Sequence, residues 1–572
     1  MKNCKIIDNI NQLFHNAGTK QENRLNVLID SLVDKEVKEE NRDFIEQNIQ
    51  HLLSKLDFQN KELMQELFMK LGSKYTKCKL DQYYTPLTIS HFISSLMMVV
   101  SDATTETKKV IDPAGGTGDL LIYFKGHKTI WDIDPQVLKL CKLNYQLHQH
   151  QQTNLCLHQK NSLMDFKNDI NKYDYVVINP PFGSNTVITD TNILNSFVLG
   201  KEKPKQEIGV LFLELGLQLL KDKGVLFAII PSGYLGNTNA MYTELRKYLL
   251  SFKILGVIEL PKHTFKRSNT GVNVSLCIIQ KTPHFKETPP FEIFISGVEN
   301  IGYDLYKKNT PIKYKYNKET GDMLLDDVQH TPIQDNDFFH LSTQFKWFCK
   351  KNNVENIMTD PDPDPNDPND PTPPDYECVM SNALDSTILD VKRYKQTYIQ
   401  TLNKIKLNGS FDKIIQFGKI IKKACKIEKT QKYKYIDIGE ISSPLYDYKE
   451  MYGWELPIRA KYLVKKYDIL VSKLEGNFSY CVILEESQNI IATNGVFVIR
   501  PNDLNCLHVL FANIVKKDFA VIHRCLVTGS IMASLHDKDI ENILIDKNVE
   551  IKEISGIIQT LEKLITFKHV NS

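Results

Sequence analysis

The sequence lacks the cysteine patterns that bind metals or build disulfide frameworks. Its eleven cysteines are scattered over 572 residues, and no two of them form a CxxC pair. We therefore expect no metal site and reduced thiols of an intracellular protein. No apolar run approaches the ~18 residues that cross a bilayer, and Met1 to Lys20 has no signal-peptide core. The expected location is cytoplasmic, with a nuclear one left open and no membrane partner.

Two common nucleotide-binding motifs are missing as well. The glycines of residues 112–119 fit neither GxGxxG nor the GxxxxGK[ST] P-loop, because no lysine follows the last glycine. Net charge is only +2, so a nucleic-acid surface must be a local basic patch. The composition, 42% hydrophobic and 24% charged, is that of a globular protein. At one domain per ~150 residues, three or four domains are expected.

What the sequence does contain is a strand that stops abruptly. Residues 173–178, YDYVVI, are apolar or aromatic apart from one acid, and Asn179 is followed by Pro180 and Pro181, which cannot continue a ladder. The break leaves a side-chain amide and a backbone carbonyl at a strand end, with the ring of Phe182 close by. Such a site can accept hydrogen bonds from an exocyclic amino group and stack on a planar ring, as chemistry on a flipped base requires. A plain proline turn is the alternative for this motif alone.

A second strand end is rich in glycine. Val110-Ile111 ends a short strand and leads into DPAGGTGD at 112–119, after which we expect a helix. Glycines at this place let the backbone approach a ligand without a Cβ in the way. About twenty residues further on, the segment 129–134, TIWDID, ends a second strand with an acid, where an α/β fold commonly holds ribose hydroxyls.

The order of these elements predicts the fold class. Strand, glycine loop, helix, strand with a terminal acid, helix, strand, helix, strand is a doubly wound, mostly parallel α/β sheet with its ligand at the carboxyl edge. Further strands are expected at 154–158, 224–231, 254–260 and 272–279, and helices at 207–221 and 241–250.

The chain divides into five segments by composition and pattern. We expect a helical N-terminal domain at 1–75, the α/β domain at 76–300, an irregular connection at 301–358, a linker at 359–375 and a C-terminal α+β domain at 376–572. Residues 360–375 hold seven prolines and six aspartates and cannot form a core, so they mark a boundary.

The C-terminal segment contains the local basic patch. Residues 411–434 hold eight lysines against two acids, with aromatic residues between them, which is typical of a phosphate-contacting surface. The candidate DNA-binding residues are Lys419, Lys422, Lys423 and Lys426. A solvated lysine-rich face is the alternative. Helices at 386–406 and 551–567 flank short β segments, and base-reading residues would lie in loops such as 442–456.

Four motifs in order, QYYTP, DPAGGTGD, WDIDP and NPPF, carry a family resemblance. The chain is similar to DNA adenine-N6 methyltransferases, above all to type I restriction-modification modification subunits fused to half a specificity subunit, as in some single-chain type II enzymes. The resemblance runs from about residue 10 to 565. It implies the S-adenosylmethionine-dependent methyltransferase fold, S-adenosylmethionine as methyl donor, double-stranded DNA as substrate and a C-terminal target-recognition domain. It also implies a homodimer, or a restriction or specificity subunit bound through the C-terminal helices.

The resemblance assigns roles to single residues. Tyr84, Thr85 and Pro86 would line the methionine end of the donor. Asp112, Gly115, Gly116 and Gly118 would shape the loop around it, Asp132 would hold the ribose, and Asn161 would accept from the adenine amino group of the cofactor. Asn179 and the Pro180 carbonyl would bind the target amino group, with Pro181 in the same catalytic motif. Phe182 would stack on one face of the base and Phe265 on the other.

The implied mechanism relies on positioning. The amino lone pair of adenine is delocalised into the purine, and two acceptors would draw it toward a tetrahedral geometry. In-line placement then carries most of the acceleration. No thiolate is required, and the chain has no Pro-Cys dipeptide such as cytosine-C5 enzymes use. NPPF favours adenine N6 over cytosine N4, again by resemblance. The alternatives are methylation of a protein glutamine at N5, which also uses an NPP turn, and a catalytically silent DNA-binding module.

Overall fold

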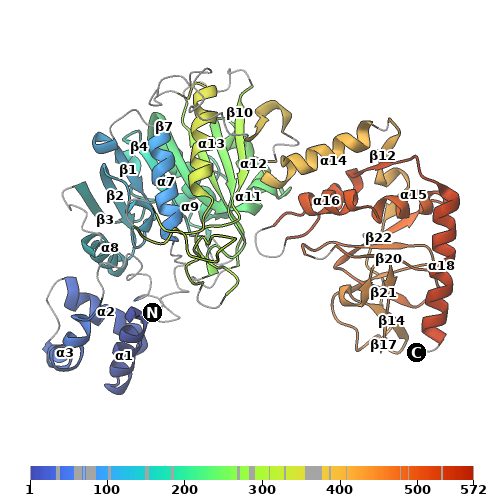
Figure 1. The fold of residues 1–572 in the computed structure, drawn as a ribbon, viewed down its shortest axis with the longest axis horizontal. Coiled ribbons are helices and arrows are strands. Elements are labelled where there is room, and N and C mark those ends of the chain that lie inside the picture. The colour runs from blue at the N-terminus through green and yellow to red at the C-terminus, as the bar shows by residue number, and fades with distance from the viewer. Residues whose placement is uncertain are drawn as a thin grey trace. The chain divides into compact units, whose positions relative to one another are not determined.

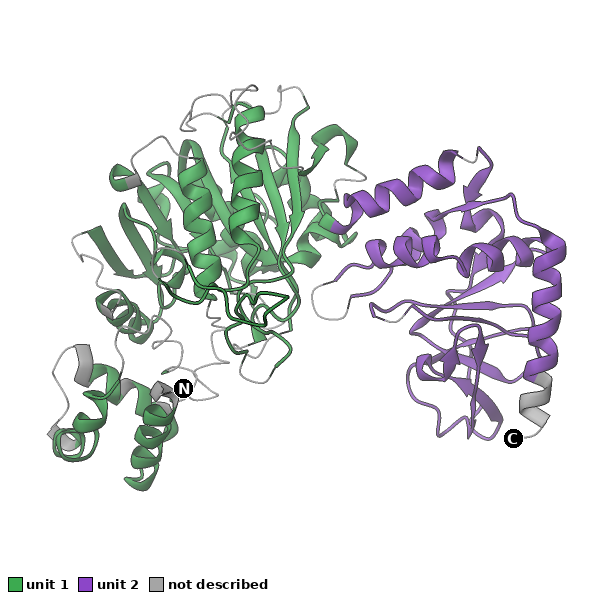
Figure 2. Cartoon of the chain, in the orientation of Figure 1, with its two compact units in different colours: residues 1–391 green, residues 392–572 purple. Residues whose placement is uncertain are grey.

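A computed structural model describes residues 2–570 except for short gaps. The gaps are 34–38, 57–66, 68–70, 72–84, 101–104, 148–153, 182–185, 267–270, 283–289, 308–309, 327–329, 355–375, 385–387, 408, 477, 487 and 530–532. The chain forms two compact units, Met1–Val391 and Lys392–Ser572 (Figure 2). The linker expected at 359–375 lies wholly outside the described residues. The second unit begins later than the residue 376 expected from sequence.

A nine-stranded sheet is the centre of the first unit (Figure 1), in the order β11-β10-β8-β9-β7-β4-β1-β2-β3. The strands are β1 Lys109–Asp112, β2 His127–Asp132, β3 Leu155–Gln159, β4 Tyr173–Ile178, β7 Leu220–Pro231, β8 Lys253–Glu259, β9 Val274–Gln280, β10 Glu292–Gly297 and β11 Glu377–Met380. Strands β3, β2, β1, β4 and β7 pair in parallel, and β9 runs antiparallel between β7 and β8. The predicted doubly wound, mostly parallel α/β fold is confirmed.

Helices cover this sheet. They include α7 Leu87–Val99, α8 Pro135–Leu147, α10 Ile208–Leu219, α12 Ala240–Leu249 and α13 Phe338–Lys351. Helices α7 and α13 lie side by side (Figure 1). The rings of Phe92 and Phe338 stack between them with centroids 4.5 Å apart. Helix α10 is apolar around most of its circumference because it is buried, and its one acid, Glu214, accepts from the backbone N–H groups of Val198 and Leu199.

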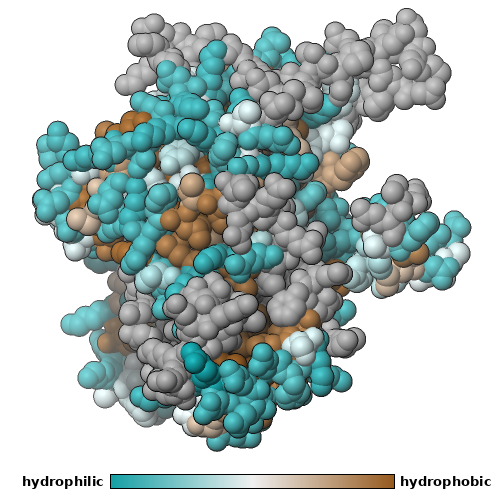
Figure 3. Space-filling view, turned by 90° about the vertical axis from the view of Figure 1, so that its left-hand side faces the viewer, coloured by the Kyte–Doolittle hydropathy of each residue, from teal (hydrophilic) through white to brown (hydrophobic). Residues whose placement is uncertain are grey.

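The N-terminal segment is helical, with α1 Lys2–Asn16, α2 Gln21–Val33, α3 Glu39–Phe44, a π-helical turn Ile45–Ile49 and α4 Gln50–Leu53. Its apolar residues form a separate cluster that includes Leu140 and Leu143 of α8. Lys139 of α8 forms an ion pair with Asp30 at 2.9 Å. The side of the molecule on the left of Figure 1 shows apolar patches among mostly hydrophilic residues (Figure 3). Within the described residues, every helix is too short or too polar to span a membrane.

The structure corrects three expectations about these elements. The helix expected after the glycine loop is a single 3-10 turn, Asp119–Leu121, and only five residues separate it from the start of β2 at His127. The connection expected to be irregular at 301–358 contains α13, together with extended segments joined by isolated bridges at 301–336. Residues 377–380 belong to the first unit, since β11 pairs with β10.

The second unit contains two four-stranded sheets. One has the order β13-β22-β19-β20, with β13 Gly418–Ile420, β22 Val496–Pro501, β19 Ile469–Ser472 and β20 Tyr480–Val482. The other has the order β17-β14-β21-β18, with β17 Lys449–Tyr452, β14 Lys432–Ile436, β21 Ile490–Thr493 and β18 Ala460–Leu463. The helices are α14 Gln396–Leu407, α15 Leu504–Ile514, α16 Lys517–Leu526, α17 Asp537–Asn542 and α18 Ile551–Val570. The expected α+β architecture is present, although α14 begins ten residues later than the helix predicted from 386.

Candidate active site

The predicted site residues of the first unit follow neighbouring strands. The glycine loop follows β1, Asp132 ends β2, and Asn179 follows β4. Because β4, β1 and β2 are adjacent and parallel, their carboxyl ends meet at one edge of the sheet. The topology therefore brings together residues that lie up to 67 positions apart in the sequence, from Asp112 to Asn179.

The three glycines of the loop have different surroundings. A Cβ on Gly115 would lie 2.4 Å from Cγ2 of Ile130, and one on Gly118 would lie 2.6 Å from Sγ of Cys141. Gly116 and Gly118 have positive φ angles of 52° and 77°, which side chains disfavour. A Cβ on Gly116 would meet nothing within 4 Å. Gly115 and Gly118 thus serve packing, whereas Gly116 faces open space.

Asp132 ties the end of β2 to the glycine loop. Its Oδ2 accepts from the backbone N–H of Gly116 at 3.0 Å, and its Oδ1 accepts from that of Asp134 at 2.9 Å. Burial raises the pKa of this carboxyl, and the two backbone N–H donors oppose the rise. Each carboxylate oxygen can still accept another bond, so the group can hold vicinal hydroxyls beside the open space at Gly116.

Two more acids are buried at the loop. Asp112 is 1% exposed, and burial raises its pKa to about 8, with a smaller contribution from the charge of Asp132. Burial raises the pKa of Asp119 to about 6, although Thr117 and Asn144 donate to its carboxylate at 2.8 and 2.9 Å. Burial thus disfavours ionisation of all three carboxyls. Asp119 was not among the predicted site residues, although the second acid of DPAGGTGD was a visible signal.

The end of β3 also contacts the loop. Asn161 accepts on Oδ1 from the backbone N–H of Leu163 at 3.1 Å, which leaves its oxygen one further lone pair. The next residue, Ser162, is buried and donates from Oγ to the carbonyl of Pro113 at 2.5 Å. This bond joins the β3 turn to the glycine loop. Ser162 was missed from sequence because its partner lies 49 positions away.

The NPP turn contains an acceptor with no partner. Asn179 donates from Nδ2 to Oγ1 of Thr85 at 3.2 Å. Its Oδ1 is buried and has no hydrogen-bond partner among the described residues. Pro180 is buried and Pro181 is half-buried, and on the other side Pro86 is buried directly before α7. Tyr84 and Phe182 lie outside the described residues.

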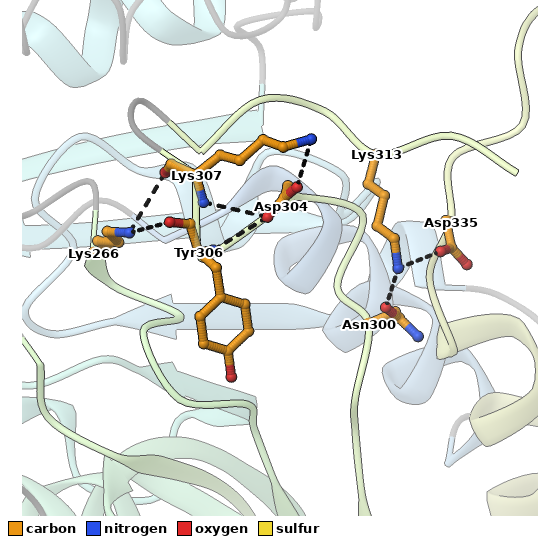
Figure 4. A network of polar contacts seen from close by, with 7 residues as sticks. All are labelled: Lys266, Asn300, Asp304, Tyr306, Lys307, Lys313 and Asp335. Carbon is orange, nitrogen blue, oxygen red and sulfur yellow. Dashed lines mark hydrogen bonds and ion pairs between the residues drawn. The ribbon is translucent and has the colours of Figure 1, made fainter.

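Phe265 is packed differently from the expectation. It is 1% exposed and belongs to the main apolar cluster of the sheet, so in this conformation its ring offers no open face to a base. The neighbouring Lys266 donates from Nζ to the carbonyl of Leu305 at 2.9 Å. It also donates to the carbonyl of Tyr306 at 3.2 Å (Figure 4). This contact fastens the Phe265 loop to the turn at 304–307. The sequence alone could not show this burial, because an aromatic residue in a loop can be either buried or exposed.

The four lysines predicted to bind DNA are all exposed on the second unit. Lys422 forms an ion pair with Glu541 at 2.5 Å. In the described part of the chain, Lys419, Lys423 and Lys426 form no ion pair. Lys419 lies on the edge strand β13, whereas Lys423 and Lys426 lie in the loop between β13 and β14. Their contact with DNA stays a prediction.

A parallel sheet with a glycine loop after β1, an acid at the end of β2 and an NPP turn after β4 defines the S-adenosylmethionine-dependent methyltransferase fold. The chain belongs to the N-6 DNA Methylase family, whose profile matches residues 59–361, more than half of the sequence. The resemblance to DNA adenine-N6 methyltransferases is thereby confirmed.

The individual relatives share a low sequence identity with this chain. The methylase subunit of the type I restriction enzyme EcoEI from Escherichia coli is 26% identical over 254 residues, which are 41% of this chain and 48% of the relative. The chain thus spans about half the length of that relative. The rRNA N(6)-adenosine-methyltransferase metl-5 of Caenorhabditis elegans is 27% identical over 28% of this chain and 68% of its own. The type IIG restriction endonuclease BpuSI aligns with 90% of this chain and 65% of its own, at 12% identity and a TM-score of 0.45.

The residues at the sheet edge fit the methyl donor of this fold. S-adenosylmethionine carries a ribose, a sulfonium and an amino acid group. Asp132 has free lone pairs for the ribose hydroxyls, and the open space at Gly116 admits a ligand beside the backbone. Among the described residues, no three His, Cys, Asp or Glu side chains gather as metal ligands.

Proposed function

We propose that the protein is a site-specific DNA methyltransferase that transfers a methyl group from S-adenosylmethionine to the N6 amino group of a flipped adenine in double-stranded DNA. The observation that carries this proposal is the buried Oδ1 of Asn179 at the carboxyl end of β4, which has no hydrogen-bond partner in the part of the chain that the structure describes. Leaving a buried acceptor unsatisfied costs about 1–3 kcal/mol. That cost is understandable if a ligand with an amino group occupies the position in the working enzyme.

The donor would be held by the residues of the sheet edge. Asp132 would accept from the ribose, the loop at Gly116 would lie against the donor, and Asn161 would contact the adenine ring of the cofactor. Thr85, Pro86 and the Tyr84 beside them would line the methionine end. When bound, S-adenosylmethionine supplies an electrophilic methyl group on a sulfonium.

The chain's own contribution is to orient the acceptor. Thr85 accepts from Nδ2 of Asn179, which fixes the amide so that Oδ1 is the free end. Oδ1 and the Pro180 carbonyl would each accept one N–H of the target amino group. Two such bonds favour the pyramidal nitrogen that attacks a methyl group, and the alignment supplies most of the rate. Phe182 would stack on the base, and the second stacking surface would require the buried Phe265 to move.

The second unit would select the DNA site. Its support is the exposed lysines of residues 419–426, three of which have no ion pair within the described residues. Helices α14 and α18 are where we expect a second copy of the chain, or a restriction or specificity subunit, to bind.

Methyl transfer from labelled S-adenosylmethionine to unmethylated duplex DNA tests the proposal. We expect transfer by the full chain, and a loss of about 100-fold or more in Asn179→Ala, as when a single group that stabilises the transition state is removed elsewhere. Donor affinity should be nearly unchanged. Asn192→Ala, an exposed asparagine on the helix Thr191–Leu194, is the matched control and should retain full activity.

Two results would contradict the proposal. Asn179→Ala with full transfer would remove Asn179 from catalysis. Transfer by the wild type to RNA or to a protein glutamine, with none to duplex DNA, would make the substrate class wrong.

A further inference from the structure

The second unit exposes two large apolar side chains on one loop. Between β17 and β18, Trp454 is 67% exposed and Ile458 is 93% exposed. Exposed apolar residues are common singly, but a tryptophan and an isoleucine four positions apart on the same loop indicate a contact surface. The loop overlaps the range 442–456 in which the sequence placed base-reading residues, and it extends three residues beyond that range, to residue 459.

This loop is held firmly against the lysine-rich stretch. The backbone N–H groups of Gly453 and Trp454 donate to the carbonyls of Gln431 and Lys429 at 2.9 and 3.2 Å. A Cβ on Gly453 would lie 2.1 Å from the carbonyl oxygen of Glu428, so only glycine allows this approach. The exposed side chains are therefore presented by a fixed backbone.

A small apolar cluster lies beneath both segments. Its members are Tyr433, Tyr435, Ala460 and Ile491, with Cys425, Ile427, Met451 and Leu456 packed against them. The cluster joins residues 425–427 to residues 451–456. We call residues 423–431 and 452–459 together the tip.

The charges of the tip are divided in a way that favours an anionic partner. Lys432 and Lys434, which follow it, form ion pairs with Glu450 and Glu485. In contrast, Lys423, Lys426 and Lys429 are exposed and form no ion pair with any described residue. Glu428 is the acid among them, and Glu455 accepts from the backbone N–H of Tyr452 at 2.8 Å. Residues 423–429 thus have a net positive charge.

We infer that the tip reads the target sequence in duplex DNA, with Trp454 and Ile458 entering a groove and Lys423, Lys426 and Lys429 contacting phosphates on either side. The inference rests on the proposed function and assigns its recognition residues. Apolar side chains contact thymine methyl groups or wedge between base steps, while lysines hold the register on the backbone. A protein partner would match the apolar pair, but it would also have to place acids opposite all three lysines, whereas every duplex supplies phosphates along its backbone.

Duplex binding by the full chain, measured between 50 and 200 mM salt, separates the two kinds of contact. The plot of log K against log salt concentration has a negative slope. Each of Lys426→Ala and Lys429→Ala should make this slope less steep by about 0.9, the value for one lost phosphate contact. Trp454→Ala and Ile458→Ala should leave the slope unchanged. Instead, their preference for the selected sequence over random duplex should fall about 10-fold, within the range of one lost base contact.

Leu504→Ala is the matched control, since Leu504 is 54% exposed at the start of α15 in the same unit. It should change neither slope nor preference. The inference is wrong if Trp454→Ala and Ile458→Ala keep the sequence preference of the wild type, even when methyl transfer to DNA establishes the proposed function. It is also wrong if these variants abolish self-association in sedimentation while DNA binding stays intact. If the wild type selects a sequence through the tip but transfers no methyl group, only the proposed function is overturned.

Discussion

Alanine substitutions at Gly116 and Gly118 should affect different properties of the protein, donor binding in the first case and stability in the second. Gly116 has a φ of 52° and its Cβ would meet nothing within 4 Å. Alanine there adds only backbone strain, about 1–2 kcal/mol. Gly118 has a φ of 77°, and its Cβ would lie 2.6 Å from Sγ of Cys141 and 2.7 Å from Cε2 of Tyr145. Overpacking adds about 1–3 kcal/mol to the strain, so Gly118→Ala should lose about 2–5 kcal/mol of unfolding free energy.

Binding should follow a different order from stability. The methyl group of Gly116→Ala would project into the open space that we assign to the donor. It would also disturb the hydrogen bond that the backbone N–H of residue 116 donates to Asp132. We expect S-adenosylmethionine to bind this variant at least about 10-fold more weakly, a loss of about 1.4 kcal/mol. Gly118→Ala fills a packed position instead, so its main effect should be on the unfolding transition.

Urea denaturation and titration calorimetry with S-adenosylmethionine measure the two quantities on the same samples. Calorimetry at low temperature keeps both variants folded. Wild-type donor affinity in Gly116→Ala would refute the assignment of the open space to the donor. A smaller stability loss in Gly118→Ala than in Gly116→Ala would refute the packing argument.

Three further outcomes follow from the same contacts. The pKa of Asp112 is raised by burial to about 8, so the folded state retains a proton that the unfolded state loses near pH 4. The unfolding free energy should therefore fall by up to about 1.4 kcal/mol per pH unit between pH 4 and 8. Urea denaturation at several pH values should show a smaller fall in Asp112→Asn. An unchanged dependence of the unfolding free energy on pH in this variant would contradict the burial argument. Tyr145→Phe removes the bond from its hydroxyl to the Gly118 carbonyl at 3.2 Å and should cost about 1 kcal/mol in the same assay, whereas no loss would mean that water replaces the bond. Thr85→Val frees Nδ2 of Asn179 and should slow single-turnover methyl transfer about 10-fold at saturating donor, and an unchanged rate would show that Thr85 does not orient the amide.

The central sheet could be predicted because its signals are local. Strands β1, β2, β4, β7 and β8 each contain an apolar run that ends at an acid or within two residues of a proline, and buried parallel strands have that composition. The glycine loop, Asp132 and the NPP turn could be assigned to one edge because parallel strands put their carboxyl ends there. A local pattern does not give the length of the connection between two strands. The prediction of a helix after the glycine loop is therefore wrong, and a short turn lies at 119–121.

The errors and omissions concern contacts between distant segments. Strand β11 joins the sheet across residues 298–376, and no local signal indicates that β10 is its partner. Thr85 meets Asn179 across 94 positions, which explains the orientation of the amide but cannot be read from either motif. The burial of Phe265 depends on the core that surrounds it. Likewise, Trp454 was one aromatic residue among many until its exposure and its anchoring on residues 429–431 were known.

Mass spectrometry of nucleosides from duplex DNA, after reaction with the full chain and isotopically labelled S-adenosylmethionine, tests the central claim most directly. The account predicts labelled N6-methyladenine with the wild type and Asn192→Ala, and almost none with Asn179→Ala. Label on N4-methylcytosine, on no nucleoside at all, or on adenine to the same extent in Asn179→Ala would contradict it.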